Sequence, residues 1–128
     1  MMKGYVSGFL LLLLVASGCG EKKVEPAKLD EAVKLIEKKE YEKAIALLDE
    51  LGKSSPNDEA LKKVRVDGHL KYGNYFMYES VAPPKEKYPS ALHQYRLAAA
   101  IDPTNNEAKQ NIQLIEGIYN QMGRTVPN

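Results

Sequence analysis

Two stretches of the chain share one spacing: residues 41–56 read YEKAIALLDELGKSSP, and residues 88–103 read YPSALHQYRLAAAIDP. In both, a Tyr is followed by Ala after three residues, by Leu or Tyr after seven, and by Pro after fifteen. Apolar residues at three- and four-residue steps predict a helix, and the Pro predicts where it ends. The stretches therefore predict two equivalent helices, 47 residues apart, with these matched positions: Tyr41 and Tyr88, Ala44 and Ala91, Leu48 and Tyr95, Pro56 and Pro103.

This spacing resembles the second helix of the tetratricopeptide repeat, in which Ala-x3-Phe precedes a helix-ending Pro. The resemblance implies that the Ala is small because the two helices of a repeat cross closely there, and that the Tyr fills the groove beside it. Tyr72-Gly73-x2-Phe76 resembles the Leu-Gly-x2-Tyr of a first helix. The usual repeat has about 34 residues. We therefore expect the additional residues in a longer third helix and in a loop at Pro83-Pro84.

The remaining periodicity extends the helical pattern over the rest of the chain, and no stretch alternates long enough to predict a strand. Helices are expected from residue 27, and over 41–51, 58–80, 89–101 and 107–122. The predicted fold is all-α: antiparallel helix pairs of a short tetratricopeptide-type solenoid over residues 26–123, with two repeats, a C-terminal capping helix and a tail at 124–128. Such solenoids need about three repeats for stability. A partner or self-association could therefore complete the core.

The first twenty residues differ in character from the rest. Lys3 precedes an apolar run, Val6 to Ala16, and small residues follow, which is the layout of a secretory signal peptide. The apolar run is about half the roughly 20 residues that a membrane-spanning helix needs. We therefore expect a signal peptide at residues 1–18, followed by a polar tether at 19–25.

The only cysteine of the chain, Cys19, closes this segment. Ala16-Ser17-Gly18-Cys19 resembles the lipobox of bacterial lipoproteins. The resemblance implies cleavage between Gly18 and Cys19, and attachment of a diacylglyceryl group to the Cys19 sulfur. Gly20 stands where an Asp would retain a lipoprotein in the inner membrane, which favours the periplasmic face of the outer membrane. The alternative is an ordinary signal peptide with an incidental cysteine.

Composition excludes several classes of function. Charged residues make up 27% of the 128 residues, and the formal net charge is +1, so no basic surface for nucleic acid is expected. His69 and His93 fall on different predicted helices, and no nucleophile, phosphate-loop or metal-ligand motif accompanies them. We therefore expect no catalytic residue, no metal and no cofactor.

The candidate site is a run of aromatic residues in the third predicted helix. Asn74, Tyr75 and Tyr78 are expected to line the concave face on which repeats of this family bind peptides or helices. The alternative is that the aromatics of this run, above all Tyr72 and Phe76, fill the core. The segment from Ser80 to Tyr88 is expected to be a loop, either a contact surface or a spacer.

These features together predict an exported, lipid-anchored module that binds a protein or peptide partner and is not an enzyme. One alternative is a permanent structural subunit of an envelope assembly, pilus or secretion complex. Another is an accessory domain for an enzyme that acts on the envelope.

Overall fold

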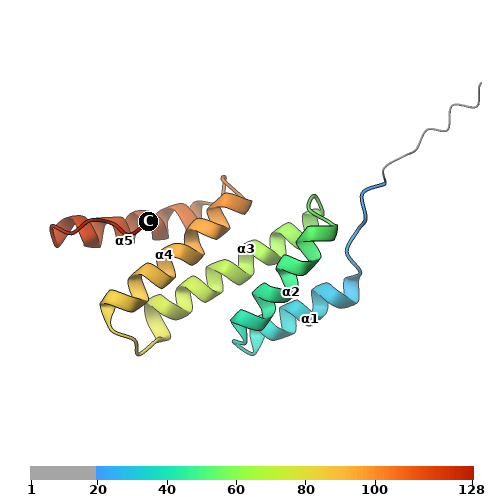
Figure 1. Cartoon of the computed structure of the whole chain (residues 1–128), viewed down its shortest axis with the longest axis horizontal. Helices are drawn as coiled ribbons and strands as arrows, with labels where there is room; N and C mark the ends of the chain where they lie inside the picture. Colours follow the sequence, from blue (N-terminus) through green and yellow to red (C-terminus); the bar gives the residue numbers. More distant parts are fainter. Residues whose placement is uncertain (1–19) are drawn as a thin grey trace, which may run out of the picture.

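The computed structural model describes residues 20–128, so the predicted signal peptide and Cys19 lie outside the described residues. In this part of the chain five α-helices follow one another, with one π-helical turn and no strand. The predicted all-α class is confirmed (Figure 1). The elements are α1 (Pro26–Glu37), α2 (Tyr41–Ser54), α3 (Glu59–Asn74), η1 (Tyr75–Glu79, the π-helical turn), α4 (Pro84–Ile101) and α5 (Asn106–Gln121).

The helices form a zigzag in which each packs against the next, and α1 also contacts α3 (Figure 1). The buried residues form two apolar clusters. One lies among α1, α2 and the start of α3, and the other lies among α3, η1, α4 and α5. Because α3 contributes to both clusters, the two helical units share one continuous packing arrangement, as in a helical repeat.

Equivalent positions of the two units have equivalent surroundings. Ala44 and Ala91 are both fully buried, and so are Leu48 and Tyr95. The correspondence continues beyond the quoted stretches. Asp58 and Asn105, again 47 residues apart, cap α3 and α5 by accepting backbone N–H groups at 2.9 Å, from Leu61 and Ala108 respectively. Pro56 and Pro103 both lie in the turns that follow α2 and α4.

The start of the fourth helix was predicted too late. We expected it near Pro89, whereas α4 begins at Pro84 and contains Pro89 in its second turn. Pro84 occupies the first helical position, where the missing N–H costs nothing. Pro89 forfeits only one helical hydrogen bond, that to the carbonyl of Lys85. The predicted loop from Ser80 to Tyr88 therefore shortens to Ser80–Pro83, and Tyr88 lies inside the helix.

The end of the third helix also differs from the prediction. The α-helical part ends at Asn74 rather than near Ser80, and the chain continues as the π-helical turn η1. The Ser80 N–H donates to the Tyr75 carbonyl at 2.8 Å, which is the five-residue spacing of a π-turn. The wider turn leaves Met77 buried and Tyr78 exposed.

Both ends of the described chain are packed against the helices. Val24 is buried before α1. After α5, the Arg96 guanidinium donates to the Pro127 carbonyl at 2.7 Å, and Val126 packs against the second apolar cluster. Within residues 20–128, no helix combines the length and the apolarity needed to cross a membrane.

Candidate functional site

Four aromatic side chains gather where the start of α2 meets the end of α3 and η1. They form the aromatic cluster: Tyr41, Tyr72, Tyr75 and Phe76. The rings of Tyr41 and Tyr72 are stacked, with centroids 5.0 Å apart and an interplanar angle of 17°. The ring centroid of Tyr75 lies 5.8 Å from that of Tyr41, and the ring centroid of Phe76 lies 4.6 Å from that of Tyr72. Such pairs contribute about 0.5–1.5 kcal/mol each beyond area burial, so ring–ring packing stabilises the cluster.

Charged side chains surround the exposed edge of the cluster. Lys39, in the turn between α1 and α2, pairs with Glu79 of η1. Its backbone has a φ of 60°, a left-handed conformation that lets the chain turn sharply into α2. The Tyr72 hydroxyl donates to a Glu42 carboxylate oxygen at 3.3 Å. Residues 39–43, Tyr72 and Tyr75 together line a surface hollow of about 350 Å³.

Two of the hydroxyls at this hollow remain donors at neutral pH. Burial, and then the charge of Glu79, raises the pKa of Tyr41 above its ordinary value. Burial, and then the charge of Glu42, raises the pKa of Tyr72. The hollow therefore presents aromatic faces, phenolic donors and flanking charges of both signs. This composition suits a polypeptide better than a small apolar molecule.

The three residues predicted to line the groove do not converge on one surface. Tyr75 joins the aromatic cluster. Asn74, one residue earlier, points towards α4 and α5, where its Oδ1 accepts from the Tyr95 hydroxyl at 2.7 Å and its Nδ2 donates to Glu107 at 3.3 Å. Tyr78 is 67% exposed. Successive helical residues point about 100° apart, so Asn74 and Tyr75 face different neighbours.

Three members of this site were not assigned to it from the sequence. Tyr41 was predicted only as a packing residue, but it stacks on Tyr72 at the edge of the hollow. Lys39 and Glu79 are 40 residues apart in the chain and meet only through the fold. The position of Tyr41 at the start of the second predicted helix was a usable signal, because Tyr41 lies beside Tyr72 at the end of α3.

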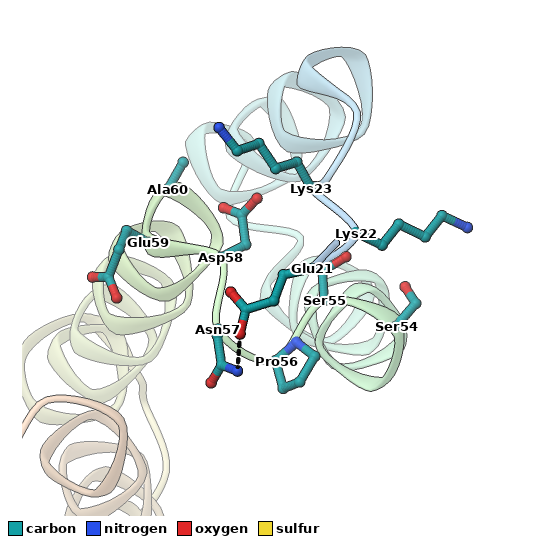
Figure 2. Close-up of a pocket in the computed structure, with 10 residues that line it drawn as sticks. All are labelled: Glu21, Lys22, Lys23, Ser54, Ser55, Pro56, Asn57, Asp58, Glu59 and Ala60. Carbon is teal, nitrogen blue, oxygen red and sulfur yellow. Dashed lines mark hydrogen bonds between the residues drawn. The ribbon is translucent and has the colours of Figure 1, made fainter. Parts of the chain in front are cut away.

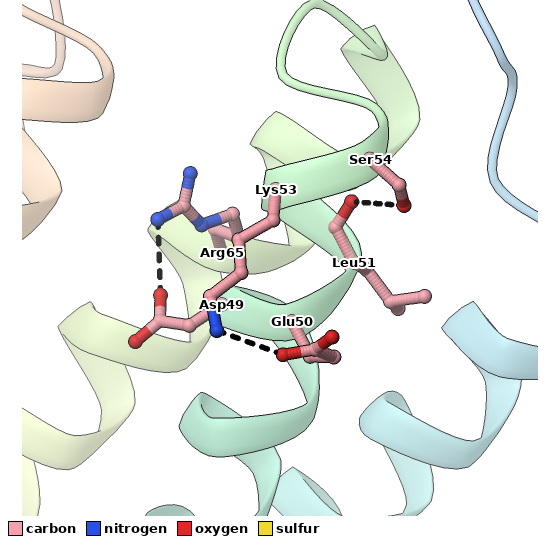
Figure 3. A network of polar contacts seen from close by, with 6 residues as sticks. All are labelled: Asp49, Glu50, Leu51, Lys53, Ser54 and Arg65. Carbon is pink, nitrogen blue, oxygen red and sulfur yellow. Dashed lines mark hydrogen bonds and ion pairs between the residues drawn. The ribbon is translucent and has the colours of Figure 1, made fainter.

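The α2–α3 interface carries a separate set of polar contacts (Figure 3). The Arg65 guanidinium of α3 donates to Asp49 of α2 at 3.0 Å, and it lies over Gly52, where an added Cβ would be 3.3 Å from an Arg65 nitrogen. Its Nε is buried and has no hydrogen-bond partner among the described residues. Glu50 pairs with Lys53 on the outer side of α2. This network joins two helices of the fold and is exposed at its edge.

Neither histidine belongs to a reactive group of side chains. His69 is 3% exposed, and its Nδ1 lies 2.8 Å from the Gln94 amide oxygen, between α3 and α4. Burial lowers its pKa, while the bond to Gln94 opposes this shift. His93 is exposed. Among residues 20–128, no three His, Cys, Asp or Glu side chains are arranged to hold a metal ion.

Comparison of the chain with protein-family models, with curated proteins and with solved structures finds no match. Its function must therefore be inferred from its own residues and geometry.

Proposed function

We propose that this chain is an exported, lipid-anchored protein-interaction module of the tetratricopeptide type. Its N-terminal sequence would direct export and acylation of Cys19, at the periplasmic face of an outer membrane. Its helices would present the aromatic cluster to a protein or peptide partner. In this proposal the chain has no catalytic role and needs no cofactor.

One observation carries the binding role: a mutually packed, partly exposed set of tyrosines at a junction of consecutive helical units. Tyr72 and Tyr75 are half-buried, so part of each ring is free for contact. Tyrosine is enriched at interface hot spots because it offers a large contact area with few rotatable bonds. Tyr78 and Val81 extend the same end of the fold, and Val81 is completely exposed. An extended segment or a helix could contact both the hollow and these two side chains.

A photo-crosslinking amino acid at position 75 tests the binding role in intact cells. We expect a crosslinked partner at position 75 and none when the same amino acid replaces Ser54, an exposed residue at the opposite end of α2. Mass spectrometry of the product names the partner. Crosslinking at position 54 alone would contradict the assignment of the binding surface.

The anchor is tested separately by the variant Cys19→Ser. We expect this variant to leave the membrane fraction, because a serine hydroxyl is not a substrate for thiol alkylation. If the variant stays membrane-bound, the lipid anchor is wrong, whatever the outcome at position 75.

A permanent structural subunit is the second candidate, and the outer face of α5 favours it. This face carries an apolar residue at every fourth position: Leu114, Ile118 and Met122. The side chains of Leu114 and Met122 are about half exposed. Glu116 is the only charged residue between positions 110 and 123. Depletion of charge around an apolar stripe is typical of an interface core. Stable co-purification with a fixed stoichiometry, lost in Leu114→Glu, would favour this candidate over a transient binder.

A further inference from the structure

The segment before α1 is held against the turn between α2 and α3. Val24 is 9% exposed and packs with the first apolar cluster. Its N–H donates to Asp58 Oδ2 at 2.9 Å. Three residues earlier, the Glu21 carboxylate accepts from the Asn57 side-chain amide at 2.7 Å (Figure 2). Residues 21–24 are therefore docked on the fold and do not form a free linker.

Asp58 uses its two carboxylate oxygens for two different tasks. Oδ1 accepts the Leu61 N–H at 2.9 Å and so caps α3, while Oδ2 holds Val24. These backbone donors, Leu61 first and Val24 next, lower the pKa of Asp58 below its ordinary value. The carboxylate is consequently charged at neutral pH, and the residue that starts α3 also fixes the chain in front of α1.

Covalent chain geometry limits the distance between Cys19 and this docked segment. Only Gly20 separates it from Glu21, and two Cα–Cα steps span at most about 7 Å. A lipid on Cys19 would therefore lie close to the α2–α3 turn. Figure 2 shows the Lys22 and Lys23 side chains extending to opposite sides of the segment before α1. Neither forms an ion pair with a carboxylate in the described part of the chain, although the carboxylates of Glu21, Asp58 and Glu59 line the same pocket as the two lysines.

We propose that the α2–α3 end of the fold rests on the lipid headgroups in a set orientation, with Lys22 and Lys23 facing headgroup phosphates. This inference depends on the proposed acylation of Cys19. Ammonium groups near an anionic bilayer are attracted to its surface. The aromatic cluster lies at the far end of α3, whose 16 residues span about 24 Å. In Figure 1 the segment before α1 runs beside the α2–α3 turn, and η1 lies at the opposite end of α3. The binding surface therefore points away from the membrane.

The variant Asp58→Asn separates docking from folding. Asn caps helices as well as Asp does, so its Oδ1 retains the bond to Leu61. The second oxygen becomes an NH₂ group, which cannot accept the Val24 N–H. Hydrogen exchange at the Val24 amide should be about 10-fold faster or more in this variant, the loss expected for a hydrogen bond to a charged group. Unchanged exchange would show that residues 21–24 are not docked through Asp58.

Orientation is measured with the acylated full chain in vesicles of phosphatidylethanolamine and phosphatidylglycerol that contain a headgroup-nitroxide lipid. A fluorophore is attached to Lys53→Cys at the tether end, or to Val81→Cys at the far end, since acylation consumes the Cys19 thiol. We expect several-fold stronger quenching at position 53 than at position 81, and similar quenching at both in chains that also carry Asp58→Asn. Equal quenching in the docked protein overturns the proposed orientation.

The anchor has its own readout in this experiment. If the chain does not sediment with the vesicles, the acylation of Cys19 is refuted and the orientation with it. Val24 exchange, measured in the same preparation, still reports whether the segment is docked. If the protein sediments with the vesicles and its Val24 amide is protected from exchange, equal quenching at positions 53 and 81 refutes the orientation alone.

Discussion

Gly73→Ala tests a close approach between two helices, α3 and α4. Gly73 of α3 faces the ring of Tyr95 in α4, and an added Cβ would lie 2.5 Å from Cε1 and 2.8 Å from Cδ1. Tyr95 is fully buried, and its hydroxyl is held by Asn74. The ring therefore cannot move aside without losing that hydrogen bond, and the helices must separate.

The magnitude follows from two opposing terms. Replacing a mid-helix Gly by Ala gains about 1 kcal/mol of helix propensity. Overpacking a close-packed core costs about 1–3 kcal/mol, and contacts this short with a fixed ring belong at the upper end of that range. We expect Gly73→Ala to lower the free energy of unfolding by about 2 kcal/mol. Gly117→Ala is the matched control, because an added Cβ in α5 meets nothing within 4 Å.

Thermal unfolding followed by circular dichroism measures both variants in the mature Cys19→Ser chain. A domain of this size shifts its Tm by about 4–8 °C per kcal/mol. Gly73→Ala should therefore melt roughly 10 °C below the parent, and Gly117→Ala slightly above it. If the Gly73→Ala and Gly117→Ala proteins have the same Tm, the close crossing of α3 and α4 is refuted. Urea denaturation should give the same ranking.

Three further predictions concern the α3–α4 interface. Ala91→Leu should destabilise the fold by about 1–3 kcal/mol in urea unfolding, because Ala91 is fully buried where helices pack, and an unchanged midpoint would contradict the equivalence of the two units. Asn74→Ala should cost about 1–3 kcal/mol, because it leaves the Tyr95 hydroxyl buried without an acceptor; Tyr95→Phe in the same chain should restore part of that loss, measured as a double-mutant cycle. His69 has a pKa below the ordinary 6.5, so the unfolded chain binds more protons between these two values, and stability should fall as pH is lowered through 6.5. His69→Gln should flatten that decline in a series of melts at different pH, and an equal decline in both proteins would exclude His69 as its cause.

Local sequence signals predicted the elements best where caps and apolar spacing agree. The last helix was expected at 107–122 and is observed at Asn106–Gln121, because Asn105 caps it and the apolar stripe runs its full length. The second helix begins at Tyr41, as its spacing predicted. The start of α4 was misplaced because the prediction assigned Pro83-Pro84 to a loop after the third helix, whereas Pro84 occupies the first helical position of α4. No local signal was found in the sequence that distinguishes the π-helical turn at residues 75–79 from a continuing α-helix.

The candidate site was predicted less completely than the fold. Of the residues in the predicted aromatic run, Tyr72 and Tyr75 lie at the hollow that the structure forms, and their role in binding stays a prediction. Asn74 was expected at the same surface but serves the α3–α4–α5 junction. That outcome depends on a buried Tyr95 hydroxyl that needs an acceptor, and the acceptor comes from another helix. Acylation of Cys19 and the identity of the partner stay predictions.

The sequence by itself determined the all-α class, the approximate helices and the two equivalent units, because helical periodicity, caps and breakers act within a few residues of the chain. It also predicts export and acylation of Cys19, because the predicted signal depends only on the order of residues along the chain. Only the tertiary structure decided that Tyr41 stacks on Tyr72, that Asn74 turns inward and that residues 21–24 dock on Asp58. These contacts join residues 21 to 34 positions apart. Each polar group or ring at these positions had several available partners, and the packing of whole helices selected one.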